Sequence, residues 1–253
     1  MTEEKLTGNK MGKKRTFVLI ATLWVVAMVS SPAFADKELN GKLLNAAENG
    51  KIEKLRQLMD QGASVDAINE NGTTALMMAA LNGHLDIVKT LIENGAKINV
   101  ARKDGTTALI RAAVKGHLDT VKILIENGAK ISAANEDGAT AFIMAALTGH
   151  LDIVKILIEN GAKIDAVTNR GLNALMVAIV RGHLDIVKTL IENGAKIDAV
   201  SENGSTAFKL ATAKGHLGIV KILIEKGANV DATNENGTTM LMAAALKGHL
   251  DIV

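Results

Sequence analysis

The chain has 253 residues, 29 Lys and Arg against 27 Asp and Glu, and no cysteine. The lack of cysteine excludes disulfide scaffolds, thiol nucleophiles, cysteine-ligated zinc and iron–sulfur clusters. Only 2% of the residues are aromatic, which argues against nucleic-acid-binding modules that stack bases on Phe, Tyr or Trp. Hydrophobic residues nevertheless make up 48% of the chain, so its core must be built from Ala, Leu, Ile, Val and Met.

The first 35 residues have the layout of a secretory signal peptide. A basic run at 13–15 precedes thirteen residues, 17–29, of which only one is polar. A small-residue motif, A-F-A, follows, so we expect cleavage between Ala35 and Asp36. The alternative is an uncleaved membrane anchor, but this apolar run is shorter than the roughly 20 residues that a spanning helix needs.

Cleavage would change the charge of the chain. The first 35 residues hold five of the basic and two of the acidic residues, so 24 basic and 25 acidic residues would remain. This balance removes a global electrostatic argument for binding nucleic acid or an anionic membrane. The leader has a bacterial layout, so we expect the mature protein in the periplasm or outside the cell, without stable membrane insertion. Both Met1 and Met11 are candidate starts, because Met11 gives a more compact leader.

The rest of the chain repeats one unit every 33 residues. Nineteen of the 21 glycines after the leader fall into three series with this spacing. The series are Gly50, Gly83, Gly116, Gly149, Gly182, Gly215 and Gly248; Gly62, Gly95, Gly128, Gly161, Gly194 and Gly227; and Gly72, Gly105, Gly138, Gly171, Gly204 and Gly237. A sustained period of this length predicts a solenoid, in which each unit packs only on its neighbours.

Residues 69–101 illustrate the first half of the unit. The segment 69–72, Asn-Glu-Asn-Gly, predicts a tight turn. Thr74 is placed to cap a short helix over 75–81, since its hydroxyl can accept a hydrogen bond from an early backbone N–H. Gly83 is expected to end this helix in the left-handed conformation.

The second half of the unit predicts another helix, from His84 to about Asn94, with Gly95 ending it. Asp86 lies in its first turn, where the helix dipole favours an acidic side chain. Four apolar residues are spaced to line one face of this helix. They are Leu85, Val88, Leu91 and Ile92.

The recurring pattern G-x-T-A-L-x-x-A-A-x-x-G-H-L-D-I-V-K-x-L-I-E-N-G-A-K-I resembles the ankyrin repeat. The resemblance covers residues 36–253. It implies an all-α solenoid of stacked helix-turn-helix units, with hairpin-like turns projecting from one side. The implied division is 1–35 for the signal peptide, 36–68 for an N-terminal capping repeat, 69–101, 102–134, 135–167, 168–200 and 201–233 for ankyrin repeats, and 234–253 for an incomplete repeat.

The chain departs from the family pattern at the start of the first helix. The T-P-L-H of the family becomes T-A-L-M at 74–77, and no copy keeps the Pro or that His. We therefore expect mainly apolar packing where the family has a polar link. The last copy ends at Val253, in the middle of its second helix. We expect a fragment of a longer array; a last helix that frays is the alternative.

No arrangement of residues in the sequence predicts catalysis. All six histidines occupy one repeat position: His84, His117, His150, His183, His216 and His249. Stacked helices lie about 8–10 Å apart, whereas metal ligands converge about 2 Å from one ion, so we interpret these histidines as structural residues at a helix start. The motifs of phosphate-binding loops, dinucleotide sites, zinc peptidases and serine hydrolases are absent. We expect no catalytic residue, no cofactor and no metal.

The copies differ most at the turn tips and along the first helix, while the second helix is nearly constant. By resemblance to ankyrin arrays, the variable positions line the hairpin tips and the concave groove. The candidate partner-binding residues are Glu70, Asn71, Leu81, Lys103, Asp104, Arg111, Lys115, Glu136, Asp137, Asn169, Arg170, Arg181, Glu202, Asn203, Lys214, Glu235, Asn236 and Lys247. Methionines of the repeats, such as Met77, Met78 and Met144, are either core filler, which is commoner, or a soft binding stripe.

We therefore expect a non-catalytic scaffold that binds a protein partner, and no nucleic acid, through its tips and groove. Two alternatives belong to other classes. One is a structural array that self-associates through its uncapped C-terminal end. The other is an accessory protein that stabilises an exported enzyme.

Overall fold

The computed structural model describes residues 32–230, 239–246 and 248–249. Most of the expected signal peptide therefore lies outside the described residues. The same holds for three candidate binding residues, Glu235, Asn236 and Lys247, and for the last four residues of the chain.

The described residues form a series of paired helices. Their bounds are α2 (Pro32–Glu48), α3 (Ile52–Asp60), α4 (Ala75–Asn82), α5 (Leu85–Glu93), α6 (Ala108–Lys115), α7 (Leu118–Glu126), α8 (Ala141–Thr148), α9 (Leu151–Glu159), α10 (Ala174–Arg181), α11 (Leu184–Glu192), α12 (Ala207–Lys214), α13 (Leu217–Glu225) and α14 (Met240–Leu246). In the hairpin turns, isolated β-bridges, such as the one between Ile68 and Thr74, take the place of extended strands. The predicted all-α solenoid is confirmed.

The first helix of each repeat begins and ends as its sequence predicts. In α4, the Thr74 hydroxyl accepts a hydrogen bond from the Met77 backbone N–H at 3.2 Å. Asn173 caps α10 in the same way through its side-chain oxygen. Gly83 follows α4 with φ of 72°, a conformation in which a Cβ would be strained.

The second helix differs from the prediction in which residues face the core. Val88 and Leu91 of α5 are fully buried, as expected, but so is Ile87, whereas Leu85 is only half-buried. The helix starts one residue later than predicted, at Leu85. Asp86 lies in the first turn and its carboxylate accepts a hydrogen bond from the Ile87 N–H at 2.8 Å.

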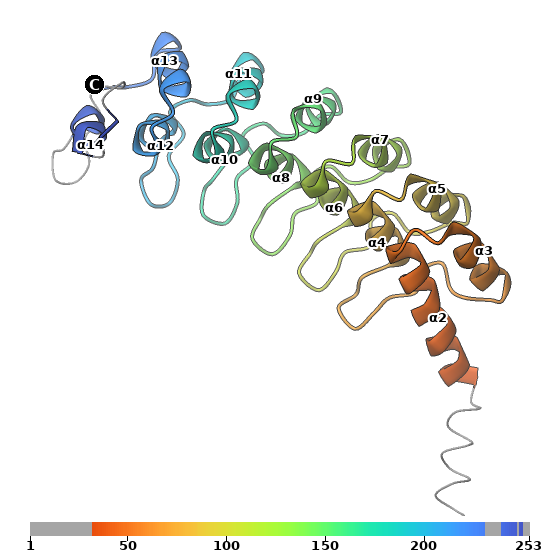
Figure 1. Ribbon diagram of the computed structural model, residues 1–253. Coiled ribbons are helices and arrows are strands. Elements are labelled where there is room, and N and C mark those ends of the chain that lie inside the picture. The colour runs from red at the N-terminus through yellow and green to blue at the C-terminus, as the bar shows by residue number, and fades with distance from the viewer. Residues whose placement is uncertain (1–31, 231–238, 247, 250–253) are drawn as a thin grey trace, which may run out of the picture.

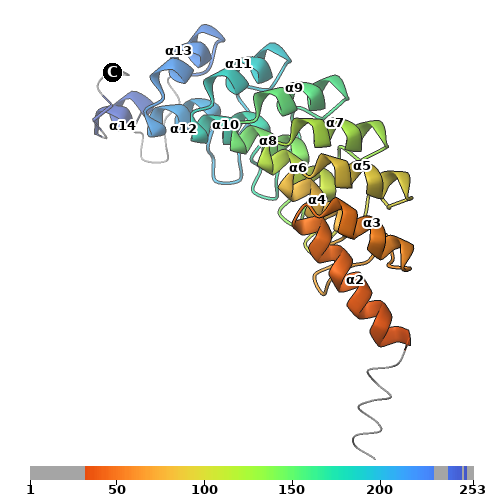
Figure 2. The same cartoon turned by 45° about the vertical axis from the view of Figure 1, so that its right-hand side comes forward.

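The helices stack in two layers along a curved array (Figure 1). The first helices, α4 to α14 in even numbers, lie on the concave side together with the hairpin turns, and the second helices lie on the convex side (Figures 1 and 2). First helices pack on one another more extensively than second helices do. Paired alanines, such as Ala79 and Ala80 in α4 or Ala112 and Ala113 in α6, are completely buried there. These small side chains let the inner helices approach closely, which accounts for the curvature.

The position where the family has a histidine is filled by apolar packing, as expected. Met77, Ile110, Ile143 and Met176 are all buried at this position. The fifth copy differs, because Lys209 stands there and donates a hydrogen bond from Nζ to the Gly204 carbonyl at 3.2 Å. Met77 therefore belongs to the core, while Met78 and Met144 are half-buried on the inner helices.

The N-terminal unit has a longer first helix than the repeats. Helix α2 starts at Pro32 and runs through the predicted cleavage point between Ala35 and Asp36. Cleavage there would remove its first four residues, and it stays a prediction. Leu43 and Ala47 of α2 are fully buried, whereas Lys42 and Asn45 are exposed. None of the helices in the described residues has the length and apolar character needed to cross a bilayer.

Candidate functional site

The hairpin tips form a continuous edge along the concave side. Within one tip, the Gly72 N–H donates to the Asn69 carbonyl at 2.9 Å and closes the predicted turn. Between tips, a backbone N–H of each copy donates to a carbonyl of the copy before it. These bonds are Lys103 to Asn71 at 3.2 Å, Glu136 to Asp104 at 2.8 Å, Asn169 to Asp137 at 2.8 Å and Glu202 to Arg170 at 3.2 Å. These hydrogen bonds therefore fix the backbone of the tips, while most of the tip side chains face solvent.

Some candidate tip residues stabilise the turns themselves. The Asn203 side-chain oxygen accepts hydrogen bonds from the Ser201 hydroxyl at 2.7 Å and from the Ser205 N–H at 3.2 Å. The Asn169 side chain donates to the Glu136 carbonyl of the preceding tip at 2.7 Å. Asn169 and Asn203 therefore stabilise the turns, a role that variation between the copies did not indicate. Glu70, Asn71, Asp137, Arg170 and Glu202 are exposed.

Asp104 lies in a charged cluster at the second tip. Arg102 Nη1 is 3.2 Å from Asp104 Oδ2, and Asp104 Oδ1 accepts from the Thr106 N–H at 2.9 Å. Partial burial would raise the pKa of Asp104, but the hydrogen bonds from Thr106 and the charges of Arg102 and Arg111 together lower it. Arg111 is half-buried, and this burial, with Arg102 nearby, lowers the pKa of its guanidinium. Arg111 and Asp104 thus belong to an internal cluster as well as to the predicted groove.

The last turn of the inner helices carries a row of positive charges. Lys115, Arg181 and Lys214 occupy the same position in α6, α10 and α12, and all are exposed. No ion pair joins any of them to another side chain in the described part of the chain. We call Lys115, Arg181 and Lys214 the basic row. It offers three cations to a molecule on the concave side.

An apolar row beside the tips was missed by the sequence analysis. Ile68, Val167 and Val200 recur at one repeat position, directly before the tip, and are 60%, 52% and 62% exposed. Two further copies have exposed alanines at this position, Ala101 and Ala134, and Thr233 of the last copy lies outside the described residues. The sequence could have indicated this row, because these apolar residues lie outside the predicted helices. We call Ile68, Val167 and Val200 the apolar row.

Four of the histidines link neighbouring repeats. The ring Nε2 of His117 lies 3.0 Å from the carbonyl oxygen of Leu81 in the preceding copy. Since a carbonyl oxygen only accepts, Nε2 donates in this bond. The equivalent bonds join His84 to Glu48 at 3.0 Å, His150 to Val114 at 3.1 Å and His183 to Leu147 at 3.3 Å. His117 stands at the start of the second helix, as the sequence indicated, and its ring forms a hydrogen bond to the preceding repeat. Among residues that the structure describes, no three His, Asp or Glu side chains converge to hold a metal.

Comparison with known proteins identifies the family to which the repeats belong. Residues 43–135, 131–201 and 197–253 match the family described as ankyrin repeats (3 copies). No match was found among curated proteins. Ankyrin repeats are in general protein–protein interaction modules, and the family is typically non-catalytic. With stacked helix pairs, projecting hairpins and family matches over most of its length, the chain belongs to the ankyrin-repeat family.

Proposed function

We propose that this protein is an exported, non-catalytic scaffold that captures a protein partner on its concave side. The observation that carries the proposal is the basic row, Lys115, Arg181 and Lys214, which is exposed and has no ion pair within the described residues. Charges on a rim guide association and set specificity when the partner carries the opposite sign. The favoured partner therefore presents an acidic surface to the inner helices.

The apolar row supplies the second part of the proposed contact. Exposed Ile and Val side chains at 52–62% exposure can lose most of that area to a partner. Burying apolar area contributes about 25 cal/mol per Å², and such contacts near the centre of an interface often dominate affinity. Copies stacked about 10 Å apart give a concave face about 50 Å long, enough for a standard interface of about 800 Å² per partner.

Export is proposed from the leader alone. A basic run, an apolar stretch and a small-residue motif precede Asp36 in the order that secretion signals require. The N-terminus of the mature protein tests this part. Mass spectrometry of the protein from the exported fraction should give a chain beginning at Asp36, and a chain that retains residues 1–35 would contradict export with cleavage.

Reversing the basic row tests the binding surface. Replacing Lys115, Arg181 and Lys214 by Glu should weaken capture of the partner from the exported fraction by at least about tenfold, because three attractive contacts become repulsive. Arg111 is left unchanged, since a Glu there would lie beside Asp104 and unsettle the internal cluster. Capture is measured by affinity purification and quantitative mass spectrometry.

The matched control reverses three charges on the convex side. Lys89, Lys155 and Lys221 are exposed on α5, α9 and α13, so their replacement by Glu changes the net charge equally. This variant should keep its capture, and both variants should keep the helical circular dichroism of the parent. Equal loss in the two variants would show that net charge, rather than the concave face, governs capture. Recovery of the chain's own copies alone would favour the self-associating array.

A further inference from the structure

Neighbouring repeats are joined by a short acidic or amide side chain in the loop after the second helix. The side-chain Oδ1 of one copy accepts a hydrogen bond from a lysine backbone N–H of the next. These bonds run from Lys97 to Asp66 at 2.9 Å, from Lys130 to Asn99 at 2.8 Å and from Lys196 to Asp165 at 3.1 Å. In the N-terminal unit, Asn40 of α2 accepts from the Ser64 N–H at 2.8 Å. The same backbone donor thus finds an oxygen acceptor at three junctions between repeats and once within the N-terminal unit.

The junction between residues 132 and 163 breaks this rule. Ser132 stands where the other copies have Asp or Asn. Its hydroxyl is one bond shorter than a carboxylate arm, and it makes no hydrogen bond with Lys163. Within the described residues, the Lys163 backbone N–H has no acceptor. Lys163 and Ser132 are both exposed, so this N–H is open to water or to a molecule that enters the space beside it.

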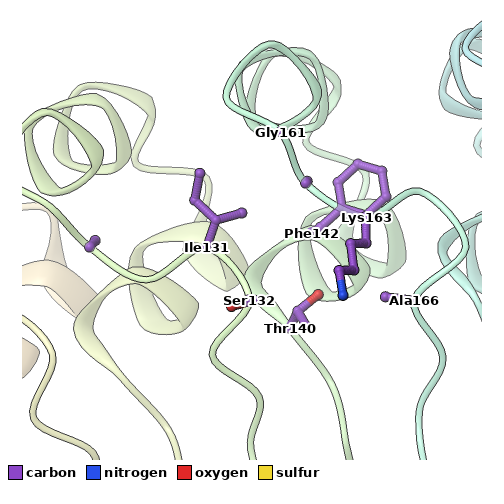
Figure 3. A pocket seen from close by; sticks show the side chains of 9 residues that line it. Ile131, Ser132, Thr140, Phe142, Gly161, Lys163 and Ala166 are labelled. Atoms are coloured by element: carbon purple, nitrogen blue, oxygen red, sulfur yellow. The ribbon is translucent and has the colours of Figure 1, made fainter.

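A cavity of about 460 Å³ lies at this junction. Ser132 and Lys163 line it, together with Ile131, Phe142, Ala162 and Thr140 (Figure 3). Figure 3 shows the Phe142 ring and the Ile131 side chain coming from neighbouring repeats to opposite parts of the space. The volume falls within the range of about 300–1,000 Å³ that is typical of small-molecule sites. The cavity therefore combines apolar walls with an unpaired backbone donor and one cationic side chain.

We propose that this cavity binds a small organic carboxylate. One carboxylate oxygen would accept from the Lys163 N–H, taking the place of the Asp or Asn oxygen at the other junctions. The Ser132 hydroxyl is a second donor, and the Lys163 ammonium supplies charge complementarity. The apolar body of the ligand would lie against Ile131 and Ala162, which are half-buried. The other repeats indicate the ligand chemistry, because a carboxylate or amide oxygen accepts the hydrogen bond from the equivalent N–H there.

Benzoate is a suitable probe, since it joins a carboxylate to a compact apolar body. We expect benzoate to shift the amide resonance of Lys163 in a saturable way at millimolar concentration and to raise the thermal midpoint of the protein. Benzyl alcohol has the same ring without the carboxylate and should produce neither change. An equal response to benzyl alcohol, or a shift that never saturates, would overturn the proposal.

Two variants at position 132 separate ligand binding from a general effect on the fold. Ser132→Asp supplies the missing carboxylate from the chain itself, so the benzoate affinity should fall at least about tenfold. Ser132→Ala removes the second donor but keeps the space and the free Lys163 N–H, so the benzoate affinity should fall, but by less than in Ser132→Asp. If Ser132→Asp bound benzoate as tightly as the parent, the Lys163 N–H would not be the recognition point. Capture of a protein partner is not used in this test, so the two proposals fail independently.

Discussion

Replacing Leu157 by Ala is expected to lower the free energy of unfolding by about 2–5 kcal/mol. Leu157 lies in α9, at the middle of the array, and its side chain is 0% exposed. The substitution removes packed methyl groups and leaves a cavity that the helices on either side can fill only in part. Because each repeat packs only on its neighbours, no distant part of the molecule compensates for the loss.

Urea titration followed by circular dichroism measures this loss. Ile224→Ala is the control, because Ile224 lies in a second helix but is 47% exposed. Its cost should stay below about 1 kcal/mol, since much of the side chain is already in water. Equal costs for the two substitutions would contradict the assignment of Leu157 to a tightly packed core.

Replacing Gly149 by Ala should be nearly as harmful, for a different reason. Gly149 ends α8 with φ of 87°, and a Cβ there would come within 2.7 Å of Cε1 of His183 in the next repeat. Backbone strain costs about 1–2 kcal/mol, and crowding of the ring adds about 1–3 kcal/mol, so we expect a loss of roughly 2–5 kcal/mol. The measurement is again the free energy of unfolding in urea.

The substitution Gly161→Ala distinguishes the cost of backbone strain from the cost of crowding a neighbouring ring. The φ of Gly161 is 83°, but an added Cβ would meet no atom within 4 Å. Gly161→Ala should therefore cost only the backbone strain, about 1–2 kcal/mol. Removing the ring with His183→Ala should also erase the excess cost of Gly149→Ala in a double-mutant cycle. Additive costs in that cycle would show that the His183 ring and Gly149 do not interact.

The period of 33 residues and the capping residues predicted the fold because they act locally. Thr74 needs only the backbone N–H three residues later, and Gly83 needs only its own φ angle. Contacts between repeats could not be predicted in this way. The bond from His117 to Leu81 spans 36 residues, and it depends on how closely the inner helices stack.

The candidate site was predicted in part, because variation between copies marks exposed positions without saying what each side chain touches. Lys115 and Arg170 are exposed, as a binding surface requires. Arg111 varies between copies too, yet it lies half-buried beside Asp104. Ile68 pairs with Thr74 in a hairpin bridge, and its side chain is 60% exposed although it is apolar. Ser132 stands out in the sequence only once the role of Asp66 and Asn99 is known.

The most direct test of concave-side binding is site-specific photocrosslinking in cells that express the protein. A photoreactive amino acid is introduced singly at Asn71, at Lys115 or, on the convex side, at Lys155, all of which are exposed. Our account predicts that Asn71 and Lys115 crosslink to the same protein partner and that Lys155 does not. Crosslinks to that partner from Lys155, with none from Asn71 or Lys115, would contradict it.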